Sequence, residues 1–86
     1  MDIEFDPAKD AQNIAKHGLS LADAAAFELA SARVTIDDRF DYGETRYRAF
    51  GRVEGQGRCL VFTWEPGKIR VISFRRAREK EMRRYE

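Results

Sequence analysis

The chain has 86 residues, of which 43% are hydrophobic, 12% aromatic and 36% charged. This length provides for one hydrophobic core, so we expect a single domain over residues 1–86. With one histidine and one cysteine, an internal disulfide is excluded and a zinc site of the usual N/S type is not expected. The sequence shows neither a run of about 18 apolar residues nor a charged-then-apolar leader, so we expect a soluble, unsecreted, cytoplasmic protein.

The formal net charge of +1 conceals an uneven distribution along the chain. Residues 1–45 hold ten acids and four bases, whereas residues 66–86 hold eight of the 16 Lys and Arg and only three acids. Such asymmetry favours a surface that faces a polyanion. A nucleic acid and an acidic protein partner would both use such a surface.

The first elements are a short strand and a helix. Residues 2–6 alternate polar and apolar side chains, as in a half-buried strand. Asp6 and Pro7 then form an N-cap followed by proline at the first helical position, and the helix should end at His17 before Gly18. Its apolar stripe is expected at Ala8, Ala11, Ile14 and Ala15. Another face carries Lys9, Asn13 and Lys16.

A second helix is expected to start after Ser20, whose side chain suits an N-cap. Leu21, Ala24 and Ala25 would form its inner face. The helix should end near Phe27, because Glu28 falls on the same apolar arc and burying an unpaired carboxylate is costly.

From Arg33 onward the period of the pattern changes to two, which predicts four strands. We expect them at 34–38, 45–53, 58–64 and 69–74, followed by a charged helix over 75–86. Their short connections imply an antiparallel meander, with 58–64 and 69–74 central because both faces are apolar. Cys59 lies in the first of these and should be buried. The fold class is therefore α+β, in the order β-α-α-β-β-β-β-α.

Short motifs spread along most of the chain resemble those of BrnT-type toxins. They are Phe5-Asp6-Pro7-Ala8-Lys9, Asn13, Lys16-His17-Gly18, Phe27, Gly43-Glu44-Thr45-Arg46, Gly51, Ile69-Arg70-Val71-Ile72-Ser73, Arg75-Arg76-Ala77, Glu81 and Tyr85. The resemblance implies a RelE-like fold and a ribonuclease toxin of a bacterial type II toxin–antitoxin pair. It also implies a BrnA-type ribbon-helix-helix antitoxin as partner, through which operator DNA would be bound indirectly. Two positions depart from the pattern: Phe5 replaces an expected tryptophan, and Phe74, where a small residue is usual, would alter the floor of the site.

RNA cleavage through the substrate's own 2′-hydroxyl needs a base, a cation for the phosphate and a proton donor, and it needs no metal or other cofactor. His17 is the one side chain with an unperturbed pKa near neutrality, so it is a candidate base or acid. It could equally be a helix-ending residue that interacts with the last carbonyls. Glu44 and Arg46 could act as base and phosphate holder, or form a simple ion pair.

Arginines are expected to converge on one surface. Arg46, Arg48 and Arg52 share a face of one strand, and Arg75 joins His17, Glu44 and Arg46 as a candidate catalytic residue. The candidate RNA-binding residues are Lys9, Lys16, Arg48, Arg70, Arg76 and Arg78. The rings of Tyr42 and Tyr47 could stack on unpaired bases or face the core. The alternative function is a non-catalytic basic module that binds an acidic protein or a nucleic acid.

In the final helix the spacing predicts two ion pairs, Glu79 with Arg83 and Arg78 with Glu81.

Overall fold

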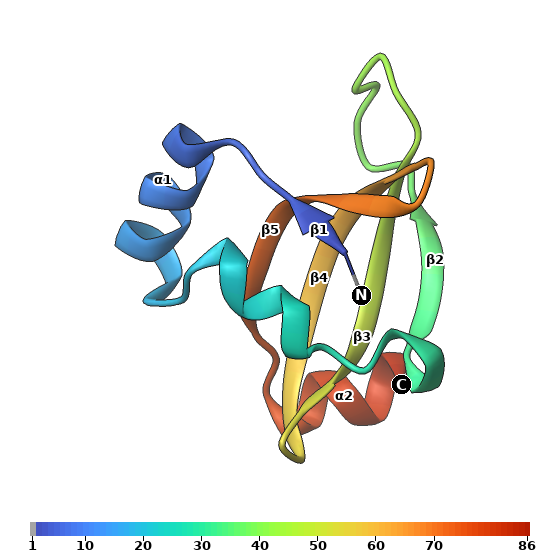
Figure 1. The fold of residues 1–86 in the computed structure, drawn as a ribbon. Coiled ribbons are helices and arrows are strands. Elements are labelled where there is room, and N and C mark those ends of the chain that lie inside the picture. Colours follow the sequence, from blue (N-terminus) through green and yellow to red (C-terminus); the bar gives the residue numbers. More distant parts are fainter. Residues whose placement is uncertain (1) are drawn as a thin grey trace.

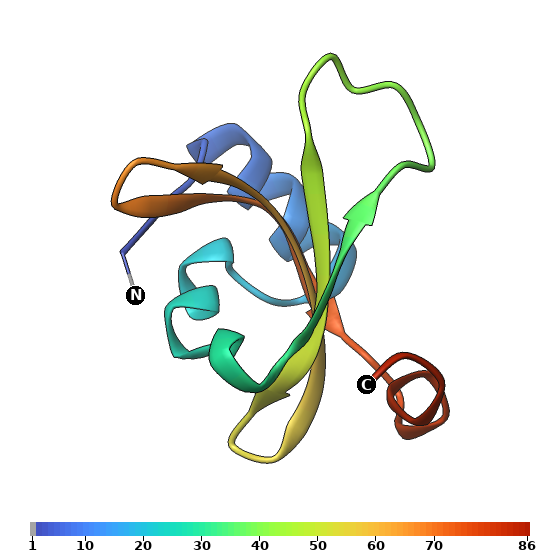
Figure 2. The same ribbon diagram turned by 90° about the vertical axis from the view of Figure 1, so that its right-hand side faces the viewer.

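The computed structural model describes residues 2–86, which form a five-stranded sheet with helical segments on both faces (Figures 1 and 2). The elements are β1 (Ile3–Glu4), α1 (Pro7–His17), the 3₁₀ helices η1 (Leu21–Ala26) and η2 (Leu29–Ser31), β2 (Arg33–Asp37), β3 (Arg46–Val53), β4 (Gln56–Glu65), β5 (Lys68–Arg76) and α2 (Glu79–Tyr85). None of the helices in this described part is long and apolar enough to cross a membrane.

The strand order is β1-β5-β4-β3-β2, and β2 to β5 form the expected antiparallel meander with β4 at its centre. The sheet as a whole is mixed, however, because β1 runs parallel to β5 with Ile3 opposite Ile69. The antiparallel meander was therefore predicted correctly, and the parallel pairing of the first strand was not predicted. Since β1 is far from β5 in the chain, no hairpin dictates its direction, and it covers part of an otherwise unpaired edge.

The two faces of the sheet have different partners, as Figure 2 shows. On one face, η1 and η2 cover the larger core, whose buried residues are Leu21, Ala24, Phe27, Ala49, Leu60, Phe62, Ile69, Val71 and Phe74. On the other face, α2 covers a smaller cluster of Phe50, Cys59, Ala77 and Met82. Because α2 is short, it leaves the rest of this second face open to a ligand.

Helix α1 has the predicted ends but a different buried face. Asp6 Oδ1 accepts a hydrogen bond from the Ala8 amide (2.9 Å), and Gly18 has a left-handed φ of 71°. The expected apolar stripe is exposed, with Ile14 at 48%, whereas Asn13 is only 6% exposed. The helix therefore docks through a polar residue, which apolar periodicity does not reveal.

Asn13 joins α1 to the edge of β5. Its amide nitrogen donates to the carbonyls of Leu19 (2.8 Å) and Phe74 (2.8 Å), and its Oδ1 accepts from the Phe74 amide (3.2 Å). The carboxamide thus pairs with Phe74 as the peptide of a neighbouring strand would. This pairing brings the C-terminal end of α1 to β5.

The second helix begins after Ser20 and ends at Phe27 as predicted, but it is 3₁₀ rather than α. Its period of three places Leu21 and Ala24 on the buried side, whereas Ala25, expected on the inner face, is exposed. Asp10 anchors its start, because Asp10 Oδ1 accepts from the Ser20 hydroxyl (2.9 Å) and the Leu21 amide (2.7 Å).

The last helix starts at Glu79 rather than at residue 75, because Arg75 and Arg76 remain in β5 opposite Cys59 and Arg58. This extension of β5 keeps Arg75 on the sheet.

The two expected ion pairs of the last helix were wrong, because the acids face arginines on the sheet. Glu79 pairs with Arg52 at 2.9 Å, and Glu81 pairs with Arg75 at 2.9 Å.

Candidate functional site

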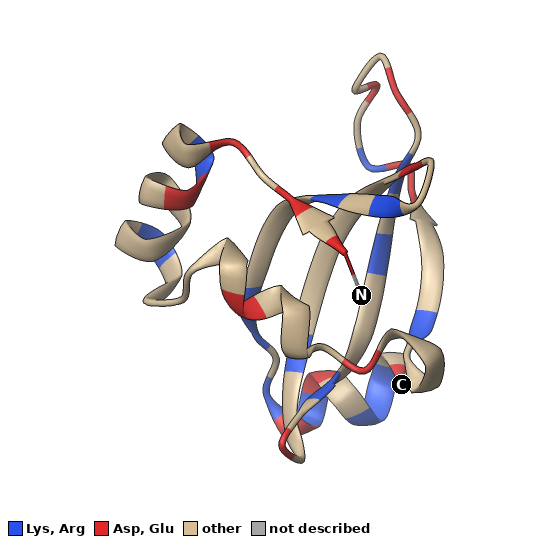
Figure 3. Cartoon of the chain, in the orientation of Figure 1, with Lys and Arg blue, Asp and Glu red and all other residues tan. Residues whose placement is uncertain are grey.

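A cleft of about 240 Å³ lies on the face of the sheet that α2 covers only in part. It is lined by Lys16, His17, Asp37, Arg39, Tyr42, Arg46, Arg48, Cys59, Val61, Ile72, Ser73 and Arg75. Residues from the end of α1, from four strands and from the β2–β3 loop therefore meet in one concavity. Figure 3 shows that basic residues also continue along β3 and α2.

Arg46 and Arg48 supply guanidinium groups that have unused donors. They lie two residues apart on the same face of β3, where Arg46 is opposite Asp37 of β2 and Arg48 is opposite Thr35. The Nε atoms of both are buried and have no hydrogen-bond acceptor within residues 2–86. A buried donor without a partner costs about 1–3 kcal/mol, so an anionic ligand that accepts from these groups would recover free energy.

Arg75 reaches the cleft from β5 and is held by a carboxylate. Its Nη1 and Nη2 donate to the two carboxylate oxygens of Glu81 at 2.9 and 3.0 Å. This contact raises the pKa of Arg75 and lowers the pKa of Glu81. The fork-to-carboxylate geometry is also the geometry that an arginine offers to a phosphate.

His17 is the last residue of α1 and enters the cleft from its edge. Its backbone carbonyl accepts from Nη1 of Arg76 (3.3 Å), which fixes the end of the helix against β5. Partial burial lowers the pKa of His17, and the charges of Lys16 and Arg75 lower it further. These effects favour the neutral imidazole, which is the form that can accept a proton.

The cleft also contains a buried acid and a cation that sequence reasoning had missed. The Asp37 side chain is 1% exposed and accepts from Nε (2.7 Å) and Nη2 (2.8 Å) of Arg39 and from the Tyr42 hydroxyl (3.3 Å). Chiefly because of Arg39, the pKa of Asp37 falls to about 2. The available signal was the period-two alternation, which places Asp37 opposite Arg46 on the face of the arginines.

Tyr42 connects this acid to the phosphate-binding candidates. The Arg46 guanidinium carbon lies 4.1 Å from the centre of the Tyr42 ring, a cation–π contact that orients the arginine. Of the two tyrosines considered for base stacking, Tyr42 thus lies in the cleft. Tyr47 lies on the opposite face, stacked on Phe62 with ring centres 5.6 Å apart.

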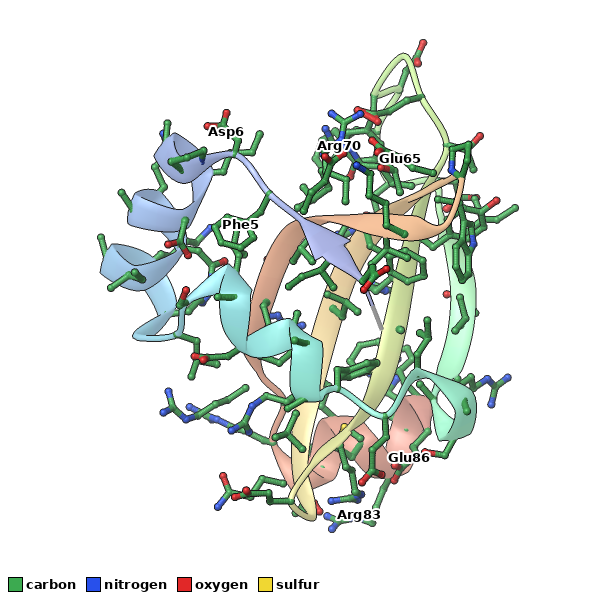
Figure 4. All side chains as sticks on the ribbon, in the orientation of Figure 1. Phe5, Asp6, Glu65, Arg70, Arg83 and Glu86 are labelled. Carbon is green, nitrogen blue, oxygen red and sulfur yellow. The ribbon has the colours of Figure 1, made fainter. Side chains whose placement is uncertain are left out.

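Several predicted site residues lie outside the cleft. Glu44 does not line it, and its carboxylate makes a 3.6 Å ion pair with Arg46. Lys9 is exposed on α1, nearly two turns before Lys16. Arg70 lies beside Glu65 at the far end of β4 and β5 (Figure 4), and its Nε donates to that carboxylate at 3.0 Å.

Arg76 and Arg78 line a second depression of about 470 Å³ beside α2. Arg75 lines both this depression and the cleft, so the two concavities share one wall. The basic corner predicted from the sequence is therefore adjacent to the cleft and partly separate from it.

Phe74 does not form the floor of the cleft, contrary to the prediction. Its side chain points to the larger core, where it is 1% exposed and meets the Phe27 ring edge-on at 6.1 Å. The residues that do face the cleft from β5 are Ile72, Ser73 and Arg75. The register shift between β4 and β5 leaves Ile72 without a partner, so Phe74 lies on the core side together with Ile69 and Val71.

Within residues 2–86, no group of three or more His, Cys, Asp or Glu side chains is arranged to hold a metal ion. A family model described as the ribonuclease toxin BrnT of a type II toxin–antitoxin system matches residues 5–81. No curated protein matches the chain.

Proposed function

The chain belongs to the BrnT family of type II toxin–antitoxin ribonuclease toxins, and we propose that its cleft cleaves RNA by using the substrate's 2′-hydroxyl as the nucleophile. One observation carries this proposal: two arginines with unused buried donors, Arg46 and Arg48, share a cleft with a histidine whose pKa is lowered by burial and by neighbouring cations. These are the cation and the proton acceptor that the reaction requires.

We assign the proton acceptor to His17. The imidazole takes the proton of the 2′-hydroxyl, the 2′-oxygen forms a bond to phosphorus, and the bond from phosphorus to the 5′-oxygen breaks. Glu44 is less suited to this role, because it lies outside the cleft and its side chain is 37% exposed. The products are a 2′,3′-cyclic phosphate and a 5′-hydroxyl.

Arg46 and Arg48 would hold the non-bridging phosphate oxygens, whose negative charge grows as the 2′-oxygen attacks. Because a guanidinium stays protonated, neither arginine can serve as the base or as a proton donor. Lys16 is the candidate donor for the leaving 5′-oxygen, since its ammonium group carries transferable protons and lines the same cleft.

Arg75 and the second depression offer a path for the flanking phosphates. A strand that leaves the cleft past Arg75 would reach Arg76 and Arg78, which line the adjoining concavity. Lys9 and Arg70 are further away and would act only at long range, where salt screens them.

A type II toxin has an antitoxin as partner, and we propose that this one is of the BrnA type. It would inhibit by covering the cationic cleft, and operator DNA would be bound through the antitoxin alone. We further propose that residues 1–86 act as one toxin domain with a RelE-like fold in the cytoplasm.

The test is RNA cleavage by the purified chain with and without EDTA. We expect cleavage in both, a 2′,3′-cyclic phosphate product, and no cleavage of single-stranded DNA. Arg46→Ala together with Arg48→Ala should lower the rate by at least about 100-fold and relieve growth arrest when the chain is induced alone. Arg83→Ala, on the exposed side of α2, is the matched control and should change neither.

Two results would contradict the proposal. Cleavage that requires an added divalent metal would refute the mechanism. Salt-sensitive RNA binding with no turnover at any concentration would identify the chain as a binding module instead.

A further inference from the structure

The loop between β2 and β3 carries an aromatic side chain that the fold does not use. Phe40 is 71% exposed, more than any other large hydrophobic residue in the described part of the chain. Exposing a phenylalanine forgoes about 1.5–3 kcal/mol of burial free energy, so its position calls for an explanation. In Figure 2 this loop lies on the same side of the sheet as α2, which is the side of the cleft.

The loop is anchored on both sides of Phe40, although Phe40 itself is exposed. Arg39 is bound to the buried Asp37 through two side-chain nitrogens, and the Tyr42 hydroxyl donates to the same carboxylate. Asp41 closes a local turn, because its Oδ1 accepts from the Gly43 amide (3.0 Å). The ring is thus presented by a constrained segment, which lowers the entropy lost when a ligand binds.

Phe40 also lies close to the residues proposed to bind phosphate. Its ring meets the Tyr42 ring edge-on, with centres 5.9 Å apart, and Tyr42 in turn lies against the Arg46 guanidinium. Moving outward from the cleft, a cation that can bind phosphate (Arg46) is therefore followed by an exposed flat ring (Phe40). A nucleotide chain presents the same two groups, an anionic phosphate and a flat base.

We propose that Phe40 is a stacking site for an unpaired base of the RNA, next to the phosphate that Arg46 holds. This inference rests on the proposed ribonuclease function and narrows its substrate to single-stranded RNA. In a duplex the bases are stacked on each other and their faces are not available to the ring. Stacking of a base on an aromatic side chain contributes about 1–3 kcal/mol, which corresponds to about 5- to 150-fold in affinity.

A fluorescence titration tests the contact directly. Trp64 is the one tryptophan of the chain and packs near Tyr47 and Phe62 on the face opposite to the cleft. In the double variant Trp64→Phe with Phe40→Trp, the new indole is the sole reporter. Single-stranded RNA with methylated 2′-hydroxyls, which cannot be cleaved, should quench its fluorescence. The same sequence in a duplex should leave the fluorescence unchanged.

Affinity measurements separate stacking from a general effect on the loop. Phe40→Ala should raise the Kd for the methylated single strand by about 5- to 150-fold, and Phe40→Tyr should keep it within about twofold, because the ring is retained. Trp64→Ala, at a side chain 56% exposed on the other face, should leave the Kd unchanged. A single strand lacking one base at the stacking position should bind Phe40→Ala and the parent equally.

The failure of this inference can be told apart from the failure of the proposed function. If the parent cuts RNA and Phe40→Ala binds it equally well, the stacking site is wrong and the ribonuclease remains. If Phe40→Ala weakens only binding of the antitoxin, the ring is a protein contact and the inference is overturned. If the parent neither cuts nor binds RNA, both proposals fail.

Discussion

The buried carboxylate of Asp37 should make a large and pH-dependent contribution to stability. Its pKa is 3.8 in an ordinary environment and about 2 in the folded chain, because Arg39 binds both of its oxygens. This lowering corresponds to about 2 kcal/mol of stability at pH 7. Asp37→Asn keeps the shape of the side chain and removes its charge, so it should reduce the free energy of unfolding by about this amount.

The sign of the pH dependence follows from the direction of the pKa change. A lowered folded pKa means that the contribution is present above the ordinary pKa and is lost as the pH falls toward the folded one. The difference between the parent and Asp37→Asn should therefore shrink to about 1 kcal/mol at pH 3. Because Arg39 and Tyr42 both bind this carboxylate, the variant should also loosen the loop that carries Phe40.

Urea denaturation followed by circular dichroism at pH 7 and at pH 3 measures both quantities. A loss of about 2 kcal/mol should also lower the melting temperature by roughly 10 °C. Asp38→Asn is the matched control, since Asp38 is an exposed neighbour. The reasoning would be refuted if both variants lost the same stability at pH 7, or if the deficit of Asp37→Asn stayed constant between pH 7 and pH 3.

Three further predictions concern the helix end, the base and the sheet. Asn13→Leu removes three hydrogen bonds and should lower the free energy of unfolding in urea by about 3 kcal/mol. The control Gln12→Leu, at an exposed position, should lower it little. Equal losses in the two variants would contradict the anchoring role of Asn13. The kcat/KM for RNA should rise with pH through a midpoint below the ordinary histidine value, because His17 must be neutral. Because Lys16 is itself the candidate proton donor, Lys16→Gln is read by an NMR titration of the imidazole rather than by activity. The pKa of His17 should move upward in this variant, since the Lys16 charge lowers it; an unmoved pKa would contradict this electrostatic coupling. Gly57→Ala would place a Cβ 2.5 Å from Cγ of Met82 in α2 and 2.6 Å from the carbonyl oxygen of Ala77. A melting curve should therefore show about 1–3 kcal/mol of destabilisation; an unchanged curve would contradict tight packing of α2 against this glycine.

Local signals in the sequence predicted the ends of elements better than their faces. Asp6, Gly18 and Ser20 marked caps correctly, because a cap depends on the residue itself and its immediate neighbours. The prediction of the buried face of α1 was wrong, because Asn13 docks the helix through hydrogen bonds to the edge of β5. Its partner there, Phe74, is 61 residues away in the chain. Periodicity of apolar residues carries no information about such a contact.

The candidate site was predicted in part for the same reason. Arg46 and Arg48 were placed on one face by simple alternation along a strand, and the structure has them there. Arg75 was placed near them by its position at the end of the fourth strand, within a cluster of arginines. Its partner Glu81 was missed, since the pair joins a strand to a helix. Asp37 was overlooked although alternation along its strand separates it from the exposed Asp38, because its place opposite Arg46 depends on the register between two strands.

The hydrogen bond between Asn13 and Phe74 has a consequence for the order in which the proposed cleft assembles during synthesis. The imidazole of His17 reaches the cleft only when α1 has docked on β5, and β5 is the last strand to be made. A nascent chain from which β5 has not yet emerged therefore holds His17 and the arginines of β3 on segments that have not been brought together. The proposed cleft can assemble only after β5 has been synthesised.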